Sequence, residues 1–275
     1  MRKRTGAVVC PRCGRLVDVN EPVCPFCEQP NPGMFGYGPA LQRALGGFSL
    51  AKAIVIACVA LYVVSLLIDT SNLMRMRGIM DILSPSNRAL LVLGMTGAYA
   101  FAQGWWWTLL TAIFLHGSLL HLLFNMAVAW RYLHDVEELY GPLRTWVVFM
   151  AGGVVGFVVS NLASGAPTIG ASGAIFGLLA ALIVYGRRTH QHAVTQQLWM
   201  SAAMMFAFGF LMPGVNNWAH AGGFAGGFVA AEAVAFRDRR EHPVLLALGW
   251  GSVAAVVGAF GWQFAVLARM LGGSR

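Results

Sequence analysis

Charged residues are scarce in this chain. Asp, Glu, Lys and Arg make up 11% of its 275 residues, whereas an average soluble domain contains roughly a quarter. A water-soluble globule does not fit this composition, and 17 Phe, 9 Trp and long aliphatic runs do not fit a disordered chain. The 33 glycines show no three-residue period, which excludes collagen. The composition therefore predicts an all-α polytopic membrane protein.

Signals for secretion and for nucleic acid binding are also lacking. Four of the five Cys lie between positions 10 and 27 with no signal peptide before them, so we do not expect a disulfide-stapled secreted scaffold. The formal net charge is +8, but the basic residues lie between apolar blocks and form no stripe with interleaved aromatics. We therefore expect the lipid bilayer as a partner and no nucleic acid.

Apolar stretches long enough to cross about 30 Å of hydrocarbon as helices occur seven times. They are residues 51–68, 118–134, 145–162, 171–186, 196–212, 218–236 and 244–268. The stretch 89–103 is also apolar, but Gly94 and Gly97 interrupt it, so we predict that 69–117 is an interfacial loop. The run Trp105, Trp106 and Trp107 in this loop suits the membrane–water interface.

The distribution of basic residues predicts the orientation. With seven spans, the segments on the side of the N-terminus hold 14 of the 19 Lys and Arg. The opposite side holds Arg75, Arg77, Arg88, Arg269 and Arg275. By the positive-inside rule we expect a multi-pass protein of the plasma or inner membrane with a cytoplasmic N-terminus.

Four segments follow from these patterns. We expect a zinc-ribbon-like domain at 1–33, a linker at 34–50, a six-helix membrane core at 51–236, and an additional C-terminal transmembrane helix at 237–275.

The N-terminal cysteines form the pattern C-x2-C-x10-C-x2-C. Cys10 with Cys13 and Cys24 with Cys27 each form a knuckle, and two knuckles supply four thiolates for a closed tetrahedral zinc site. A redox pair or a rubredoxin-like iron site are the alternatives. A head of about 33 residues has almost no core and needs a metal to fold in any case. Four Cys ligands leave no open position, so we expect a structural role and no metal in catalysis. Cys58 in the first span is interpreted as a small buried hydrophobe.

Polar residues at membrane depth are costly and indicate function. His121 and Asn125 are four residues apart on the second span and lie on one helix face, with Ser118 as the N-cap. Helix-to-helix hydrogen bonding is the structural interpretation of this pair. Ser172, in the sequence 170–173 (GASG), opens the fourth span, where free backbone N–H groups and the helix dipole suit an anionic intermediate. A simple Ser N-cap is its structural interpretation.

His220 lies near the outer start of the sixth span, in a glycine-rich helix. Small-xxx-small pairs let helices approach closely, and the sixth span has two of them, Gly222 with Gly226 and Gly223 with Gly227. Gly173 and Gly177 form such a pair on the fourth span. Such a crossing brings a Ser next to a neutral His, which is an activated nucleophile with its general base. The outer parts of these helices contain no Asp or Glu to orient the His, so a triad is not expected.

In this order, the sequences 116–125 (HGSLLHLLFN), 170–177 (GASGAIFG) and 219–223 (AHAGG) resemble the rhomboid family of intramembrane serine proteases. The resemblance covers about 51–236. It implies a six-helix core with Ser172 as nucleophile, His220 as general base, and His121 with Asn125 as oxyanion donors. His116 matches a loop-anchoring His, Phe176 an aromatic that packs on the catalytic His, and Glu137 a Glu at the cytoplasmic end of the second helix. Gly170 and Gly173 flank the nucleophile in the same motif.

One position departs from the family pattern. Thr108 follows Trp107 where the family commonly has Arg, which puts the anchoring of the first outer loop in question.

Two function classes compete. The first is a protease that hydrolyses peptide bonds in or next to transmembrane segments of other membrane proteins, with a regulatory partner for the N-terminal domain. The second is a catalytically inactive rhomboid-like protein that binds membrane-protein clients, although such proteins lack the Ser or the His. A transporter needs charges along a midplane path, whereas Glu232 is a lone intramembrane acid, and a metalloprotease needs an HExxH motif that is lacking here.

Overall fold

A computed structural model of the chain describes residues 3–10, 13–37, 49–72, 78–212, 214–234 and 242–272. Several residues used in the predictions above lie outside the described ones. They are most of the linker (38–48, with Arg43), Arg2, Arg12, Arg75, Arg77, Arg237, Arg239, Arg240 and Arg275. The described residues form two compact units, an N-terminal head and a helical unit that begins at Leu50.

The head is a minimal two-hairpin ribbon. Strands β1 (Ala7–Val9) and β2 (Leu16–Asp18) pair antiparallel with Val8 opposite Val17, and a second hairpin closes at the bridge between Val23 and Pro30. Its small core consists of valines and the four cysteines. The 3-10 turn η1 (Met34–Gly36) is tied back by a hydrogen bond from Lys3 N to Gly36 O, so the folded head extends past residue 33.

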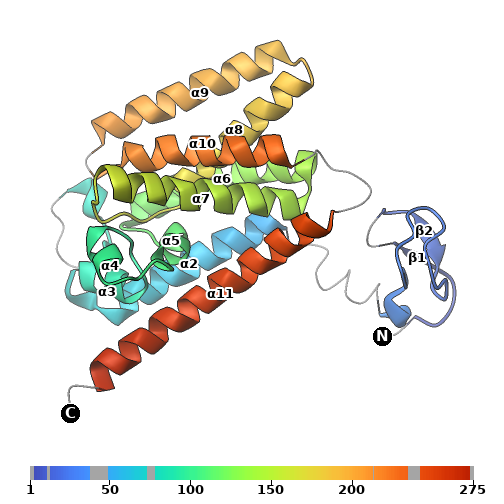
Figure 1. Cartoon of the computed structure of the whole chain (residues 1–275), viewed down its shortest axis with the longest axis horizontal. Helices are drawn as coiled ribbons and strands as arrows, with labels where there is room; N and C mark the ends of the chain where they lie inside the picture. The colour runs from blue at the N-terminus through green and yellow to red at the C-terminus, as the bar shows by residue number, and fades with distance from the viewer. Residues whose placement is uncertain are drawn as a thin grey trace. The chain divides into compact units, whose positions relative to one another are not determined.

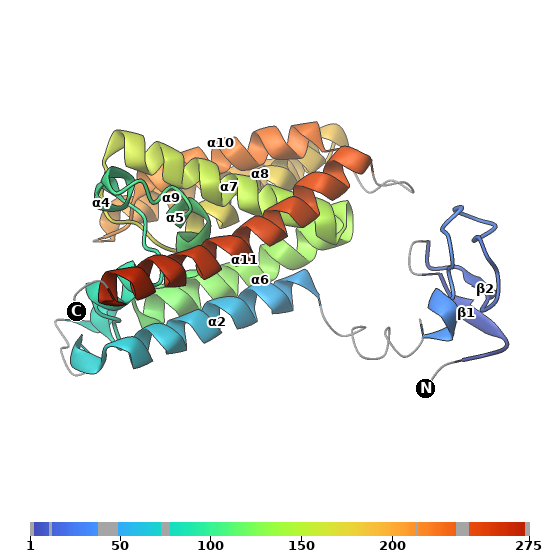
Figure 2. The same ribbon diagram turned by 60° about the horizontal axis from the view of Figure 1, so that its bottom comes forward.

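The second unit is a helical bundle (Figures 1 and 2). Its long helices are α2 (Leu50–Ile68), α6 (Leu119–Tyr140), α7 (Pro142–Ala163), α8 (Ser172–Arg188), α9 (His192–Leu211), α10 (Asn217–Ala233) and α11 (Pro243–Gly272). Each falls on one of the seven predicted apolar stretches. Buried side chains of α2, α6, α7, α8 and α10 make one continuous core.

Helix α8 lies at the centre of this core, with every residue from 173 to 184 buried. Glycines let α7 and α10 approach it at backbone distance. A Cβ at Gly227 of α10 would lie 2.1 Å from the Gly177 Cα, and a Cβ at Gly152 of α7 would lie 3.1 Å from the same atom. The predicted glycine-mediated crossing of α8 and α10 is therefore present.

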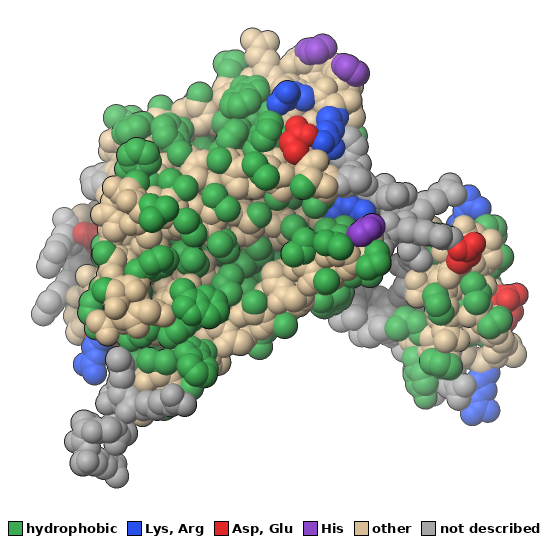
Figure 3. Space-filling model, viewed as in Figure 1, with side chains coloured by type: hydrophobic (Ala, Val, Ile, Leu, Met, Phe, Trp, Pro, Cys, Tyr) green, Lys and Arg blue, Asp and Glu red, His purple; other side chains and the backbone are tan. Residues whose placement is uncertain are grey.

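Three helices of the described chain are long and apolar enough by themselves to cross a membrane, namely α2, α7 and Pro243–Ala268 of α11. A fourth span requires Thr108–Phe114 and α6, which meet at 91°, to be one broken element. Helices α8 and α10 have 17 residues each, about 26 Å of helix, which is shorter than the hydrocarbon layer. The described surface of the helical unit is largely apolar (Figure 3), with exposed Leu67, Phe124, Phe210 and Val229 among many others. The chain is thus a multi-pass membrane protein, while seven separate crossings stay a prediction.

The segment between α2 and α6 contains short helices only, within its described residues 69–72 and 78–117. They are η2 (Thr70–Asn72), η3 (Ile79–Asp81), α3 (Asn87–Val92), α4 (Ala98–Ala102), α5 (Thr108–Thr111) and η4 (Ala112–Phe114). Gly94 (φ 96°) and Gly97 (φ 146°) break the apolar stretch 89–103 as expected, because side chains disfavour these angles.

The three tryptophans of this segment differ in their exposure. Trp106 is 66% exposed, but Trp105 and Trp107 are buried inside the protein. Their indoles stack on each other, and Trp107 also contacts Trp262 of α11.

Candidate active site

Ser172 is the first residue of α8, directly after a loop that the rest of the fold holds in place. In this loop Thr168 N donates to Thr96 O, and Gly170 N donates to Ala112 O, each at 2.9 Å. Gly170 has a φ of 118°, and a Cβ there would lie 2.8 Å from the His121 ring. Only glycine fits at position 170, which brings the His121 ring next to the backbone that leads into Ser172.

The Ser172 hydroxyl and the His220 ring meet across two helices. Ser172 Oγ and His220 Nε2 are 2.9 Å apart, although 48 residues separate them in sequence. The helices approach this closely because a Cβ at Gly223 would lie 2.2 Å from the carbonyl oxygen of Gly173. The structure therefore brings together the two side chains that the sequence singled out as nucleophile and base.

Asn217, the first residue of α10, orients the His220 ring, and the sequence reasoning missed it. Its Oδ1 lies 3.0 Å from His220 Nδ1. A carbonyl oxygen only accepts hydrogen bonds, so the ring proton belongs on Nδ1, and Nε2 is left to accept the proton of Ser172. The signal in the sequence was an Asn three residues before His220 at the start of a helix. Residues three apart lie on one face of a helix, so the two side chains can meet.

Phe176 fixes the plane of the same ring. Its ring stacks on His220 at a centroid distance of 4.6 Å and an angle of 23°. One turn of α8 therefore carries both the hydroxyl and the aromatic face that hold the imidazole.

His121 and Asn125 lie on the first turns of α6. Ser118 caps this helix by accepting from His121 N at 3.2 Å, as predicted. Gly117 N points at His121 Nδ1 at 3.3 Å, which leaves Nε2 as the protonated nitrogen, and this atom faces Gly170. Asn125 Nδ2 donates to His121 O at 2.9 Å, so the amide is turned toward its own helix. The Asn125 Oδ1 atom is buried without a hydrogen-bond partner among the described residues.

His116 is 1% exposed and packs edge-on against His121 at a centroid distance of 5.1 Å. It thus fills the space behind the His121 ring in the loop before α6. His116 therefore supports the His121 ring and is not placed to contact a substrate.

The chemistry of this site follows from its location at three helix starts. Ser172 and His121 lie in the first turns of α8 and α6, where backbone N–H groups are not used by the helix and the dipole is positive. His220 is the fourth residue of α10. Apolar core surrounds these groups, so an oxyanion formed here is stabilised more strongly than in water.

Two other polar positions differ from expectation. Thr108 is fully buried, donates to Trp105 O at 2.7 Å and contacts Thr96 Oγ1 at 3.2 Å, so the outer loop is anchored without the Arg. The interpretation of Glu232 as a lone buried acid was wrong, because it pairs with Arg188 and its side chain is 37% exposed. Cys58 is fully buried. Glu137 Oε1 accepts a hydrogen bond of 3.3 Å from Leu50 N at the start of α2.

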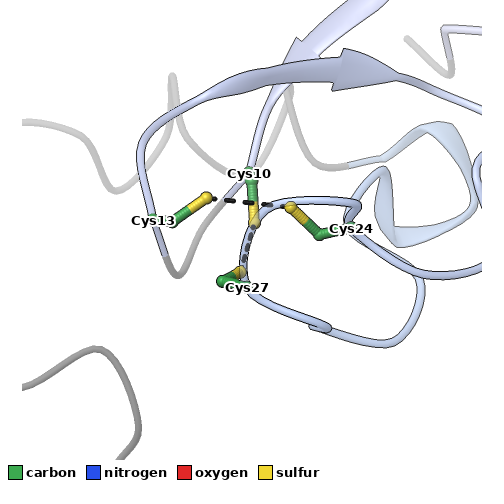
Figure 4. A group of neighbouring side chains, drawn as sticks. All are labelled: Cys10, Cys13, Cys24 and Cys27. Atoms are coloured by element: carbon green, nitrogen blue, oxygen red, sulfur yellow. Dashed lines mark hydrogen bonds between the residues drawn. The ribbon is translucent and has the colours of Figure 1, made fainter.

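The head brings its four cysteines to one point (Figure 4). All four Sγ atoms lie within 4.8 Å of one another, and the pairs Cys10 with Cys27 and Cys13 with Cys24 are both 3.7 Å apart. Zinc–sulfur bonds of about 2.3 Å in a tetrahedron place sulfurs roughly 3.8 Å apart, so the donor set fits this ion. Burial raises the pKa of the Cys24 thiol, but hydrogen bonds from the backbone N–H groups of Phe26 and Cys27 outweigh it and lower the pKa to about 7. The same donors stabilise a metal-bound thiolate.

Comparison with known proteins agrees with the geometry of the helical unit. Residues 103–237 match the family model of the Rhomboid domain. The chain thus contains a rhomboid domain over residues 103–237. Every site residue discussed above in α6, α8 and α10 lies within the matched rhomboid domain.

Named proteases are among the relatives. The chain is 36% identical over 172 residues to rhomboid protease GluP of Bacillus subtilis. The aligned region covers 59% of this chain and 34% of that protein. It is 33% identical over 129 residues to rhomboid-type serine protease 2 of Emericella nidulans. This aligned region covers 44% of this chain and 25% of that protein. With the putative rhomboid protease YdcA of Bacillus subtilis it shares 29% identity over 146 residues, 51% of this chain and 73% of that protein. The chain thus spans only about a quarter to a third of the length of the first two relatives. All three relatives are named as rhomboid proteases.

Proposed function

We propose that this chain is an intramembrane serine protease that hydrolyses peptide bonds in or next to transmembrane segments of other membrane proteins. The observation that carries the proposal is the 2.9 Å contact between Ser172 Oγ and His220 Nε2, with the second ring nitrogen on Asn217. A serine becomes an effective nucleophile when a neighbouring base can accept its hydroxyl proton, and His220 Nε2 is such an acceptor here. Protease activity among the named relatives supports the same assignment.

In this mechanism Ser172 Oγ attacks the scissile carbonyl carbon while His220 Nε2 takes the hydroxyl proton. The negative charge moves to the carbonyl oxygen, next to the backbone N–H of Ser172, the His121 Nε2–H and the Asn125 amide. Collapse of this intermediate breaks the C–N bond, and His220 returns the proton to the departing amine. A water molecule, deprotonated by the same nitrogen, then hydrolyses the acyl ester of Ser172 to a carboxylate.

Asn125 must turn to take part. Its Nδ2 donates to the His121 carbonyl in the resting site, and its Oδ1 has no partner among the described residues. Rotation of the amide toward a developing oxyanion replaces a neutral hydrogen bond by a charge-assisted one, which is roughly twice as strong. The donor is therefore engaged only as charge develops.

The substrate must offer an exposed backbone carbonyl. A transmembrane helix shields its carbonyls by its own hydrogen bonds, so local unwinding precedes attack. We expect substrates with small residues and helix-breaking Gly or Pro near the cut. Water reaches the site from the outer face of the membrane, and the N-terminal head is cytoplasmic.

The alternative is a rhomboid-like protein that binds membrane-protein clients without cutting them. Both proteins bind the same helices, but only the protease converts them. Co-expression of the full chain with a transmembrane reporter, followed by mass spectrometry of new termini, separates the two. A new N-terminus within or beside the reporter's transmembrane segment supports the protease, and binding of an intact reporter by a chain that does not cut it supports the alternative.

Orientation is tested separately. A tag at residue 1 should be digested by added protease in inverted inner-membrane vesicles and be protected in intact spheroplasts. Digestion in spheroplasts would reverse the topology and the side from which water enters.

A further inference from the structure

The seventh long helix, α11, is joined to the rest of the bundle at a few points only, and one of them is polar. Between 243 and 268 its polar side chains are Ser252 and Gln263. Gln263 is fully buried at membrane depth. A buried amide in an otherwise apolar helix is unfavourable unless all its groups are paired.

Gln263 is paired at both ends, and its partners come from the outer loop between α2 and α6. Its Oε1 accepts from the Trp107 indole at 2.8 Å. Its Nε2 donates to the carbonyls of Leu91 at 3.0 Å and Val92 at 3.1 Å. These carbonyls lie in the last turn of helix α3, and Leu91 O also accepts from Gly94 N at 3.1 Å. Gln263 therefore adds a side-chain cap to the C-terminal end of a loop helix.

The two attachment points lead to one residue, Thr96. After α3, the chain turns at Gly94, whose carbonyl is held by Thr111 Oγ1 at 2.7 Å, and reaches Thr96 two residues later. From Trp107, the next residue Thr108 contacts Thr96 Oγ1 at 3.2 Å. Both ends of the segment 91–108 are thus held by a single side chain of α11.

Thr96 in turn pairs with the backbone that leads to the candidate nucleophile. Thr168 N donates to Thr96 O at 2.9 Å, and the two residues form an antiparallel bridge. Four residues after Thr168 comes Ser172. The hydrogen-bonded chain from Gln263 therefore ends at the segment 168–170, which leads into Ser172 and its backbone N–H.

We infer that Gln263 is a positioning residue for Ser172, and that α11 holds the loop 91–108 and the segment 168–170 in the reactive arrangement. This inference rests on the proposed protease function. It assigns α11, which lies outside the matched family region, a role in turnover that simple membrane anchoring does not include.

Helix α11 also offers a matched control at Ser252. Ser252 Oγ accepts from the Trp146 indole at 2.9 Å, again a polar tie from α11 to a tryptophan. Trp146 belongs to α7, however, and not to the loop that leads to Ser172. Ser252→Ala and Gln263→Leu therefore remove comparable ties at different places.

The test measures fluorophosphonate labelling of the purified full chain in detergent, with rate at saturating probe and half-saturating concentration determined separately. Gln263→Leu should lower the saturated rate by roughly tenfold without changing the half-saturating concentration, because a misplaced nucleophile reacts slowly although the probe still binds. Trp107→Phe keeps the ring and removes the indole donor, and should give a similar loss. The double variant should be no slower than the slower single one. Ser252→Ala should label at the wild-type rate.

Hydrogen exchange of the backbone amides at 168–170 supplies a readout that does not depend on activity. It should be faster in Gln263→Leu and Trp107→Phe than in wild type, and unchanged in Ser252→Ala. Unchanged amide exchange and unchanged labelling in Trp107→Phe would overturn the inference, even if Gln263→Leu fails to fold. A loss of labelling rate in Ser252→Ala equal to that in Gln263→Leu would also overturn it. A wild-type chain that is not labelled at all would instead refute the proposed function, while the exchange measurement still decides the role of Gln263.

Discussion

Asn217 takes the place in this site that a carboxylate takes in a serine protease triad. It accepts from His220 Nδ1 at 3.0 Å and so selects the tautomer that leaves Nε2 free for Ser172. A neutral amide suits membrane depth, because a carboxylate there is costly to ionise. Its contribution is orientation rather than charge.

Asn217→Ala should therefore slow turnover by roughly tenfold with little change in KM, since the ring loses its fixed tautomer but the substrate contacts remain. Asn217→Asp retains an acceptor and should be less impaired than Asn217→Ala. Steady-state cleavage of a transmembrane reporter measures both. Equal activity of Asn217→Ala and wild type would show that Phe176 alone holds the ring.

Asn125 is the residue on which charge stabilisation is tested. Asn125→Ala should lower kcat by about 10- to 1000-fold, the usual cost of one oxyanion donor. Leu123→Ala, on the exposed side of the same helix turn, is the control and should cleave at the wild-type rate. An unchanged kcat in Asn125→Ala would mean that this amide only packs α6.

At the scale of elements, the crossing of α8 and α10 decides whether Ser172 and His220 meet. The two backbones are in contact at Gly173 and Gly223, with no room for a Cβ. Because both helices carry one partner of the pair, any separation of the helices is also a separation of the reacting groups.

Gly223→Val should destabilise the helical unit by about 1–3 kcal/mol, the usual cost of overpacking, and abolish cleavage. Gly251→Val on α11 is the matched control, since a Cβ there meets nothing within 4 Å. Thermal unfolding in detergent and reporter cleavage are measured together. A stable and active Gly223→Val protein would contradict the close crossing.

The positions of the helices could be predicted from sequence, but their partners could be predicted only in part. Apolar runs located all seven long helices, and the small-residue spacing indicated that α8 and α10 cross. Gly223 and Gly227 are the glycines that face Gly173 and Gly177, whereas Gly222 and Gly226 contact Val159 and Val155 of α7. The segment 69–117 could not be resolved, because helices as short as α5, with four residues, leave no periodicity to detect. Gln263 gave no signal, since its partner Trp107 is 156 residues away and pairing at that separation is set by tertiary packing. Asn217 was missed because its neighbour Asn216 is the residue with the N-cap pattern.

At the scale of the whole molecule, the chain contains a head with a candidate four-cysteine metal site and a helical unit with its own core. The four thiolates account for nearly all of what holds the head together, because its remaining core is three valines. The candidate active site, by contrast, contains no residue of the head. We therefore expect the head to recruit or regulate a partner and to take no part in peptide hydrolysis.

Cys10→Ser combined with Cys24→Ser should unfold the head and abolish metal binding, because two ligands do not hold a structural ion. Elemental analysis of the purified wild-type chain should find one zinc per chain, and treatment with a chelator should remove it without slowing reporter cleavage. Absence of zinc and iron would refute the metal site. Chelator-sensitive cleavage would show that the head acts on catalysis.

The central claim is that Ser172 is a nucleophile activated by His220. The most direct measurement is labelling of the purified full chain with a fluorophosphonate probe, followed by mass spectrometry of the modified peptide. The wild-type chain should carry the phosphonyl group on Ser172, and Ser172→Ala and His220→Ala should remain unlabelled while they unfold at the wild-type temperature. Labelling of the Ser172→Ala protein at the wild-type rate would contradict the account.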